Sequence, residues 1–183
     1  MSKRKLLTAA VAAMGLMGAI TVSAEEPKRT FGEYTDDTML LGKVKSALAG
    51  DDTTEANEIN VEVNKGIVQL NGFVDTAKEK AQATTVAQAV KGVKQVENNL
   101  IVKGESTSTG QSMDDSTVTA RVNTALIDSK ETKAGDIKVQ TYDGVVQLSG
   151  FVDNEAQKSA ATKVAQSVKG VKSVQNNLSV KGH

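Results

Sequence analysis

The chain consists mainly of one sequence segment that occurs twice. Every residue from Asp36 to Gly104 has a counterpart 78 positions later, from Asp114 to Gly182, with no insertion or deletion. The positions that match are mainly glycines, aliphatic residues and turn residues, which specify a backbone and its core rather than reaction chemistry. The repeat predicts two copies of one small folding unit that serves in binding or scaffolding. The clearest match is between residues 66–75 (GIVQLNGFVD) and residues 144–153 (GVVQLSGFVD).

The first 24 residues have the pattern of a cleavable signal peptide. A basic start, Lys3-Arg4-Lys5, precedes an apolar stretch over residues 6–22, and Val22-Ser23-Ala24 fits a signal-peptidase site. We expect cleavage after Ala24; an uncleaved anchor is the alternative, disfavoured because the stretch is short and rich in alanine. The chain has no cysteine, which excludes a lipid-modified N-terminus, disulfides and thiolate chemistry. These features predict a soluble protein of the Gram-negative periplasm.

The charge balance of the chain argues against nucleic acid as a partner. The 22 basic and 22 acidic residues cancel, and removal of the three basic leader residues leaves 19 against 22, a net charge of −3. With two tyrosines, three phenylalanines and no tryptophan, the sequence lacks the basic stripe and the stacking rings of nucleic-acid-binding proteins.

Two polar segments divide the mature chain. Residues 25–35 contain the only proline and show no apolar period, so we expect a flexible N-terminal segment. Residues 105–113 (ESTSTGQSM) have the composition of a short flexible linker. Two domains remain, at 36–104 and 114–182, and units of about 70 residues have only small cores.

Each repeat begins with a helix that is followed by two strands. Asp36 or Asp37 can cap the first helix, and Asp114 or Asp115 its counterpart, because a carboxylate accepts hydrogen bonds from the free amides at a helix start. Apolar residues then recur at the helical period, and a stretch of alternating residues predicts a half-buried strand. A tight turn at 64–66 or 142–144 leads into the second strand. We expect helix stripes of Leu40, Val44, Ala47, Leu48 and of Val118, Val122, Ala125, Leu126, first strands over 59–63 and 137–141, and second strands over 67–74 and 145–152.

A second helix and a third strand complete each repeat. Capping patterns at Thr76-x-x-Glu79 and Asn154-x-x-Gln157 predict where these helices begin, and Gly92 and Gly170 are expected at their C′ positions. The order helix, strand, strand, helix, strand predicts an α+β fold in which two helices cover one face of a three-stranded mixed sheet. The residues of the third strands expected to face the helices are Val96, Leu100, Val102 and Val174, Leu178, Val180.

These motifs resemble the BON domain family. Two such domains behind a signal peptide are similar to the arrangement in periplasmic proteins that are induced by hyperosmotic stress. The resemblance implies αββαβ modules without enzymatic activity, associated with phospholipid binding, envelope integrity, stress and chaperone-like behaviour toward envelope proteins. Family members with a lipid anchor carry a cysteine that this chain lacks. The resemblance is carried by Gly66, Gly72, Gly92, Asn98 and Leu100 in the first repeat and by Gly144, Gly150, Gly170, Asn176 and Leu178 in the second.

The sequence offers no convincing catalytic or metal-ligating constellation. The single histidine, His183, is the last residue, so a nucleophile–histidine couple would depend on a chain end. The aspartate pairs at 36–37, 51–52 and 114–115 are explained as caps and loop residues. Asn98 and Asn176 fall on the inward side of the third strand, where bonds to nearby backbone are expected and ligand contact is the alternative. We therefore expect no enzymatic activity, no cofactor and no metal site.

The sheet face opposite the helices is the first candidate surface. Side chains alternate along a strand, so if Val68, Leu70 and Val74 face the helices, their neighbours face the uncovered side. The alternatives are that the two repeats cover each other or that this face packs in a dimer. The predicted interaction surface consists of Ile67, Phe73, Val145 and Phe151, with Ile101 beside it in the first repeat and Ser179 at that place in the second.

The first helix of the second repeat is the other candidate. By resemblance to phospholipid-binding members of the family, this helix would contact lipid through Val118, Arg121, Val122 and Ile127. Only Arg121 is cationic and the chain is net negative, so contact with phospholipid headgroups or acyl chains should be weak and reversible.

Taken together, these patterns favour a non-catalytic periplasmic envelope-stress protein that acts as a chaperone-like binding module for envelope or outer-membrane client proteins. The alternative is a peripheral phospholipid-binding module that supports outer-membrane integrity.

Overall fold

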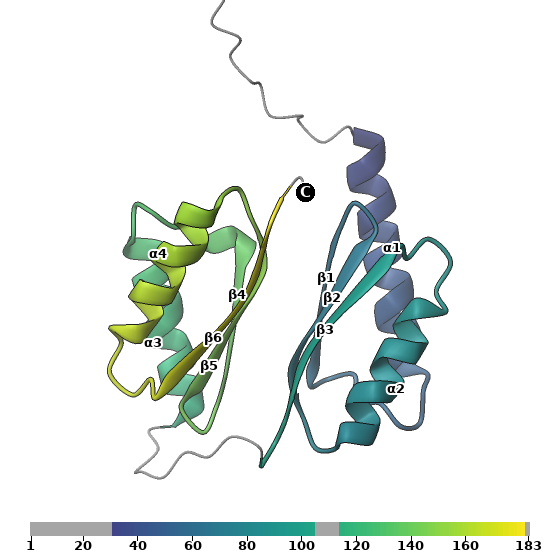
Figure 1. Cartoon of the computed structure of the whole chain (residues 1–183), viewed down its shortest axis with the longest axis horizontal. Helices are drawn as coiled ribbons and strands as arrows, with labels where there is room; N and C mark the ends of the chain where they lie inside the picture. The colour runs from purple at the N-terminus through teal and green to yellow at the C-terminus, as the bar shows by residue number, and fades with distance from the viewer. Residues whose placement is uncertain (1–30, 105–113, 182–183) are drawn as a thin grey trace, which may run out of the picture.

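The two repeats fold into two similar domains whose sheets face each other (Figure 1). The computed structural model describes residues 31–104 and 114–181. The first domain consists of α1 (Phe31–Ala49), β1 (Ile59–Asn64), β2 (Ile67–Val74), α2 (Ala77–Gln88) and β3 (Gln95–Val102). The second consists of α3 (Asp115–Asp128), the short 3-10 helix η1 (Ala134–Asp136), β4 (Ile137–Tyr142), β5 (Val145–Val152), α4 (Glu155–Gln166) and β6 (Ser173–Val180). The predicted α+β fold of two αββαβ modules is confirmed.

Each sheet is mixed, as predicted. In the first domain β1 pairs antiparallel with β2, and β2 pairs parallel with β3; β4, β5 and β6 repeat this arrangement. The register is also the same, since Leu70 lies between Val61 and Asn98 just as Leu148 lies between Val139 and Asn176. The strand register is identical in the two repeats because their sequences align without insertions or deletions.

Both helices of a domain cover one face of its sheet and enclose a small aliphatic core (Figure 1). The buried residues are those that the helical and strand periods predicted, and burial of each aliphatic side chain contributes about 1.5–3 kcal/mol. In the first domain the core includes Leu40, Val44, Leu48, Val61, Val68, Leu70, Val74 and Leu100, and in the second Val118, Val122, Leu126, Ile137, Val146, Leu148, Val152 and Leu178.

The first hairpin turn is held by an aspartate of the preceding helix. Lys65 and Gly66 both have positive φ, 53° and 83°, the conformation of a two-residue type I′ turn. Their amides donate to the Asp37 carboxylate at 2.7 and 2.9 Å. In the second domain Asp115 accepts from the corresponding turn amides at 2.7 and 2.8 Å. The repeated aspartate therefore ties the hairpin turn to the helix.

Two predictions for the start of the first helix are wrong. Because α1 begins at Phe31, neither Asp36 nor Asp37 is its cap, and residues 31–35 are helical rather than part of a flexible segment. In the second repeat the prediction holds, since Asp114 is the N-cap of α3 and accepts from the Ser116 amide at 3.0 Å. The predicted signal peptide at residues 1–24, residues 25–30 and the predicted linker at 105–113 lie outside the described residues.

The second helices begin where predicted. Thr76 caps α2 by accepting from the Glu79 amide, and Asn154 caps α4 by accepting from the Gln157 amide. The expected C′ positions of Gly92 and Gly170 are wrong, because the C-caps of α2 and α4 are Ala89 and Ser167. The two glycines take their positive φ of 108° and 103° in the turns beyond. No helix within residues 31–104 and 114–181 is long and apolar enough to cross a membrane.

Candidate binding surfaces

The predicted interaction surface on the sheets lies between the two domains. Phe73 is 6% exposed, Phe151 8% and Val145 7%, while Ile67 is half-buried. Strands β2 and β5 lie against each other, so each sheet covers the other (Figure 1). Of the alternatives that the sequence left open, the structure has the one in which the two repeats cover each other. In this closed arrangement the four residues do not form an exposed surface.

Polar side chains join the two sheets at the centre of this interface. The Gln69 side-chain amide donates to Ser179 Oγ at 2.6 Å, and its Oε1 accepts from the Gly150 amide at 3.2 Å. Gln147 stands at the corresponding position of β5 and donates to the Asn99 carbonyl at 2.7 Å. Sequence reasoning missed both residues. The available signal was a glutamine at the same place in both second strands, on the sheet face that the helices were predicted to leave uncovered.

Hydrogen bonding at this interface is incomplete. Asn71 Nδ2, Gln140 Oε1 and Gln147 Oε1 are buried and have no hydrogen-bond partner among the described residues. An unsatisfied buried polar group costs about 1–3 kcal/mol relative to a hydrated one. Separation of the sheets would hydrate these groups, which lowers the free energy needed to expose the apolar residues beside them.

An aromatic pair closes one end of the interface. The rings of Phe73 and Tyr142 are 5.5 Å apart between centroids and tilted by 33°. The Lys103 ammonium lies 5.9 Å from the centre of the Tyr142 ring, within the range of a cation–π contact. Offset rings of this kind contribute about 0.5–1.5 kcal/mol beyond the area that they bury.

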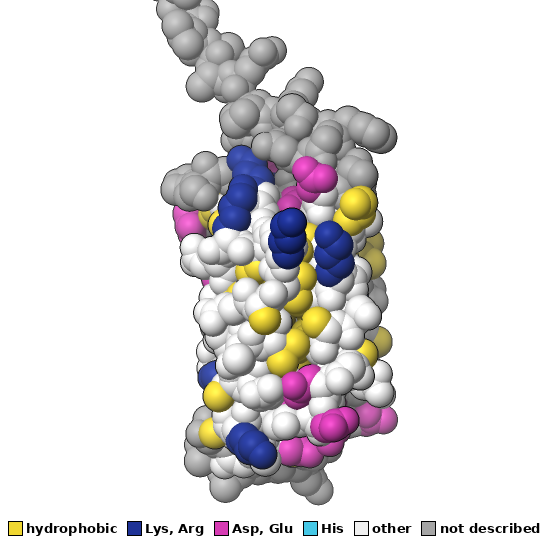
Figure 2. Space-filling view, turned by 90° about the vertical axis from the view of Figure 1, so that its right-hand side faces the viewer, with side chains coloured by type: hydrophobic (Ala, Val, Ile, Leu, Met, Phe, Trp, Pro, Cys, Tyr) yellow, Lys and Arg dark blue, Asp and Glu magenta, His cyan; other side chains and the backbone are white. Residues whose placement is uncertain are grey.

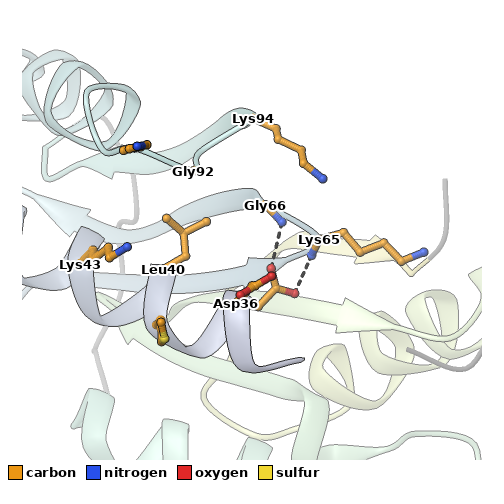
Figure 3. Close-up of a pocket in the computed structure, with 10 residues that line it drawn as sticks. Asp36, Leu40, Lys43, Lys65, Gly66, Gly92 and Lys94 are labelled. Atoms are coloured by element: carbon orange, nitrogen blue, oxygen red, sulfur yellow. Dashed lines mark hydrogen bonds between the residues drawn. The ribbon is translucent and has the colours of Figure 1, made fainter. Parts of the chain in front are cut away.

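A pocket bordered by lysines lies at the first hairpin turn, between α1 and the segment after α2 (Figure 3). It has a volume of about 290 Å³, and its apolar wall is formed by Leu40, which is buried, and Met39, which is 53% exposed. None of its four lysines makes an ion pair within the described residues, and Asp37 is occupied by the turn amides. The lysines are Lys43, Lys65, Lys91 and Lys94.

The helix face of the first domain is unevenly charged (Figure 2). Most of the basic side chains visible there lie in the upper half, and most of the acidic ones near the lower end. At the corresponding hairpin turn of the second domain, Asp143 replaces Lys65 and forms an ion pair with Lys172 at 2.9 Å. The two repeats therefore differ in charge at this turn although their folds agree.

The predicted lipid-contact helix is only partly exposed. Val118 and Val122 have no exposed surface and belong to the core of the second domain, so their predicted lipid contact is wrong in this fold. Arg121 is exposed, and Ile127 is 70% exposed near the end of α3. The helical period explains the difference, since positions 118, 122 and 126 share the face that packs on the sheet.

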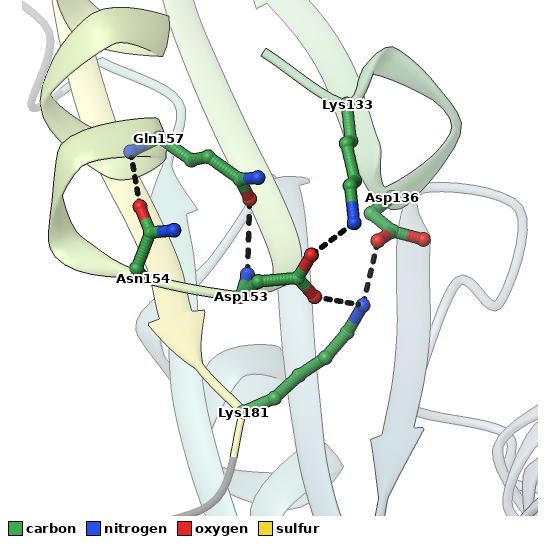
Figure 4. A network of polar contacts seen from close by, with 6 residues as sticks. All are labelled: Lys133, Asp136, Asp153, Asn154, Gln157 and Lys181. Atoms are coloured by element: carbon green, nitrogen blue, oxygen red, sulfur yellow. Dashed lines mark hydrogen bonds and ion pairs between the residues drawn. The ribbon is translucent and has the colours of Figure 1, made fainter. Parts of the chain in front are cut away.

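Matching ion-pair networks tie the end of the third strand to the loops beside it. In the second domain Lys181 binds Asp136 at 2.6 Å and Asp153 at 3.0 Å, and Lys133 also binds Asp153 (Figure 4). Hydrogen bonds from Lys133 and Lys181 lower the pKa of Asp153. In the first domain Lys103 occupies the same position between Glu58 and Asp75. The pKa of Lys103 is raised, first by its hydrogen bond to Glu58.

Several acidic groups that could have formed a site have partners within the fold. Within the described residues, one carboxylate cluster could hold a metal ion, formed by Glu55, Glu58 and Asp75, but the Lys103 ammonium already binds two of its members. Asp51 accepts from Gln82 and from the Thr53 amide, which lowers its pKa. The carboxylates of this cluster and of Asp51 therefore stabilise the fold. His183 lies outside the described residues.

Asn98 and Asn176 bond to nearby backbone as expected. The Asn98 side-chain amide donates to the Lys80 carbonyl and to Thr84 Oγ1, both at 2.6 Å, and its Oδ1 accepts from the Leu100 amide at 3.0 Å. Asn176 makes the corresponding bonds to residues of α4. These asparagines therefore hold the third strand against the second helix.

Comparison with known proteins agrees with this architecture. The BON domain family matches residues 36–104 and 114–182. Osmotically-inducible protein Y of Escherichia coli (strain K12) is 38% identical over 152 residues, which cover 82% of this chain and 75% of that protein. Outer membrane lipoprotein DolP of Haemophilus influenzae is 34% identical over 169 residues, 92% of this chain and 86% of that one. A 21 kDa hemolysin of Actinobacillus pleuropneumoniae is 35% identical over 147 residues, 80% of this chain and 75% of that one. The chain belongs to the BON domain family, of which it contains two domains in tandem.

Proposed function

We propose that this chain is a non-catalytic protein of the bacterial envelope that is used under osmotic or general stress, and that it acts as a chaperone-like binding module for envelope proteins. The names of two relatives, an osmotically-inducible protein and an outer membrane lipoprotein, support the envelope and stress setting. The leader sequence supports export to the periplasm.

The observation that carries the chaperone proposal is the interface between the sheets. It covers Phe73 and Phe151, yet it is joined by glutamine side chains and contains buried polar atoms without partners. Interfaces between domains of one chain are more polar than permanent ones and permit relative motion. Opening would present two apolar sheet faces at once to an unfolded segment, and closing would cover them again.

A cross-link between the domains tests this proposal. The chain has no native cysteine, so Asn99→Cys with Gln147→Cys can be joined by a short bismaleimide across the contact that these residues make. Aggregation of an unfolded outer-membrane protein is then followed by light scattering. We expect the uncross-linked variant to suppress aggregation and the cross-linked variant to have lost this ability. Equal suppression by both forms would show that the sheet faces are not the client surface.

A second candidate function, peripheral binding of anionic phospholipid, is favoured by the lysine-bordered pocket of the first domain. Four lysine ammonium groups, which form no ion pair with the described residues, lie beside Met39 and Leu40 and combine positive charge with apolar surface, as membrane-surface sites do. We expect flotation with vesicles that contain phosphatidylglycerol and none with zwitterionic vesicles. Lys43→Gln with Lys91→Gln should abolish flotation, whereas Lys45→Gln with Lys78→Gln, an equal charge change outside the pocket, should not.

A further inference from the structure

The two ends of the interdomain interface differ although the repeats that form them correspond. At one end Tyr142 stands against Phe73. At the other end the residue that corresponds to Phe73 is Phe151, and the residue that corresponds to Tyr142 is Asn64. A second replacement also reduces side-chain volume, because Ser179 stands where the first repeat has Ile101. The second end therefore lacks both the ring of a tyrosine and the aliphatic side chain of an isoleucine.

A groove occupies the place of the missing side chains. It has a volume of about 590 Å³ and runs between the two domains, with Phe151, Ile67 and Val180 as its apolar lining and Asn64 and Ser179 among its polar residues. Asn64 is only 3% exposed, and its Oδ1 has no hydrogen-bond partner among the described residues. This end of the interface is thus incomplete in both packing and hydrogen bonding.

The charges at the groove are mainly positive. Lys65, Lys94 and Lys158 border it, and none of them makes an ion pair within the described part of the chain. Of the two acidic residues, Glu97 accepts hydrogen bonds from Gln69 and Ser179. The aliphatic part of Lys94 packs over Gly66, which keeps this side chain at the border between the groove and the lysine-bordered pocket (Figure 3).

We propose that this groove binds an aromatic side chain of a client polypeptide, with the ring against Phe151 as the Tyr142 ring lies against Phe73. The protein itself supplies the evidence for the occupant, because the corresponding place at the other end holds a tyrosine. The free lysines favour acidic residues next to that ring. The inference rests on the chaperone function proposed above, and it names a contact that a client can make while the domains are still closed.

The test uses a variant that the second repeat itself suggests. Asn64→Tyr should place a ring against Phe151 and narrow the groove, as the Tyr142 ring lies against Phe73 beside a smaller cavity of about 390 Å³ at the other end. The matched variant Tyr142→Asn should enlarge that cavity over Phe73. The probe is a fluorescein-labelled short peptide with a central tyrosine between aspartates, and its alanine counterpart. With the full-length chain we expect the alanine peptide to bind at least about tenfold more weakly, since the ring supplies most of the buried contact.

Asn64→Tyr should weaken binding of the tyrosine peptide by a similar factor, whereas Tyr142→Asn should retain binding and raise the number of peptides bound. Amide chemical shifts of Phe151 and Ser179 should move on titration only when residue 64 is asparagine. Equal binding of the two peptides, or undiminished binding by a folded Asn64→Tyr variant, would overturn the proposal. A further outcome is that the wild-type chain binds phosphatidylglycerol vesicles but neither peptide, and that Asn64→Tyr abolishes vesicle binding. This outcome would assign the groove to acyl chains and overturn the proposed occupant.

These outcomes separate the groove from the chaperone function. If the wild-type chain suppresses aggregation and Asn64→Tyr does so equally well, the groove proposal fails and the chaperone proposal stands. If the cross-linked form binds the tyrosine peptide but no form suppresses aggregation, the groove is a peptide site and the chaperone proposal fails.

Discussion

Gln69 and Gln147 occupy the same position in the two repeats, and each points its side-chain amide at a backbone carbonyl in the third strand of the other domain. Gln147 lies 2.7 Å from the Asn99 carbonyl, and Gln69 lies 3.4 Å from that of Asn177. Asn99 and Asn177 are themselves corresponding residues. The two domains therefore meet through equivalent contacts, as the subunits of a symmetric dimer do.

Replacement of the two glutamines should have unequal effects. Gln69→Ala removes bonds to Ser179, Glu97 and Gly150, and we expect a loss of about 1–3 kcal/mol in the free energy of unfolding. Gln147→Ala removes one hydrogen bond and also a buried oxygen that has no hydrogen-bond partner among the described residues. The free energy of unfolding should therefore fall by less than in Gln69→Ala. Urea denaturation of both variants measures the difference, and equal losses would contradict the assigned contacts.

The asparagines of the third strands should contribute equally to the two domains. Asn98→Ala and Asn176→Ala each remove a bridge between strand and helix, at a cost of about 1–3 kcal/mol in the free energy of unfolding. Asn123→Ala, on the exposed face of α3, is the control and should change stability by less than about 0.5 kcal/mol. Thermal denaturation of the three variants checks the prediction. A loss at one asparagine only would show that the two bridges differ in strength.

Glycine is required at one position of each second strand. A Cβ at Gly72 would lie 2.0 Å from the Glu58 carbonyl oxygen, and one at Gly150 would lie 2.2 Å from that of Asp136. We expect either alanine variant to lose more than about 3 kcal/mol, because backbone and not a flexible side chain is in the way. Gly42→Ala, in open space on α1, should instead stabilise by about 0.5–1 kcal/mol. Chemical denaturation of the three variants measures these changes. A mild effect at Gly72 would contradict this close approach of the backbone.

Acid should weaken the ion-pair network of the second domain. Hydrogen bonds from Lys133 and Lys181 hold the native pKa of Asp153 below its ordinary value of 3.8, so the network stabilises the fold above about pH 4. That contribution is lost as the pH falls through the lowered native pKa. Lys133→Gln with Lys181→Gln should reduce the difference in unfolding free energy between about pH 6 and pH 3. Lys163→Gln with Lys169→Gln, an equal charge change on exposed side chains, should leave it unchanged.

Local rules predicted the elements of the fold because the apolar residues of each core recur along the chain at the helical or the strand period. The stripe of Val118, Val122 and Leu126 identified the buried face of α3 directly. The same stripe shows why the lipid contact assigned to Val118 and Val122 by resemblance is wrong, because one side chain cannot pack in the core and also be exposed to a bilayer. The prediction that Asp37 caps the first helix was wrong because an aspartate can accept hydrogen bonds from any amides close to it in space. Here these are the amides of a hairpin turn that is distant in sequence.

The contact between the sheets could be foreseen only as an alternative. The sequence predicted that Phe73 and Phe151 have no cover inside their own domains, and neither ring belongs to the aliphatic core of its domain. The residues that cover these two rings depend on the relative orientation of the two domains. The periodic pattern within each repeat does not predict this orientation. The groove over Phe151 could in principle have been predicted, since Asn64 and Tyr142 differ at corresponding positions of nearly identical turns.

A dimer assembled from identical subunits cannot change one end of its interface alone, because every substitution appears twice. When both copies belong to one polypeptide after gene duplication, each copy can diverge independently. Asn64 opposite Phe151, and Tyr142 opposite Phe73, are such a divergence. Covalent fusion thus allows one end of the contact to keep an aromatic pair while the other end loses it and leaves a groove.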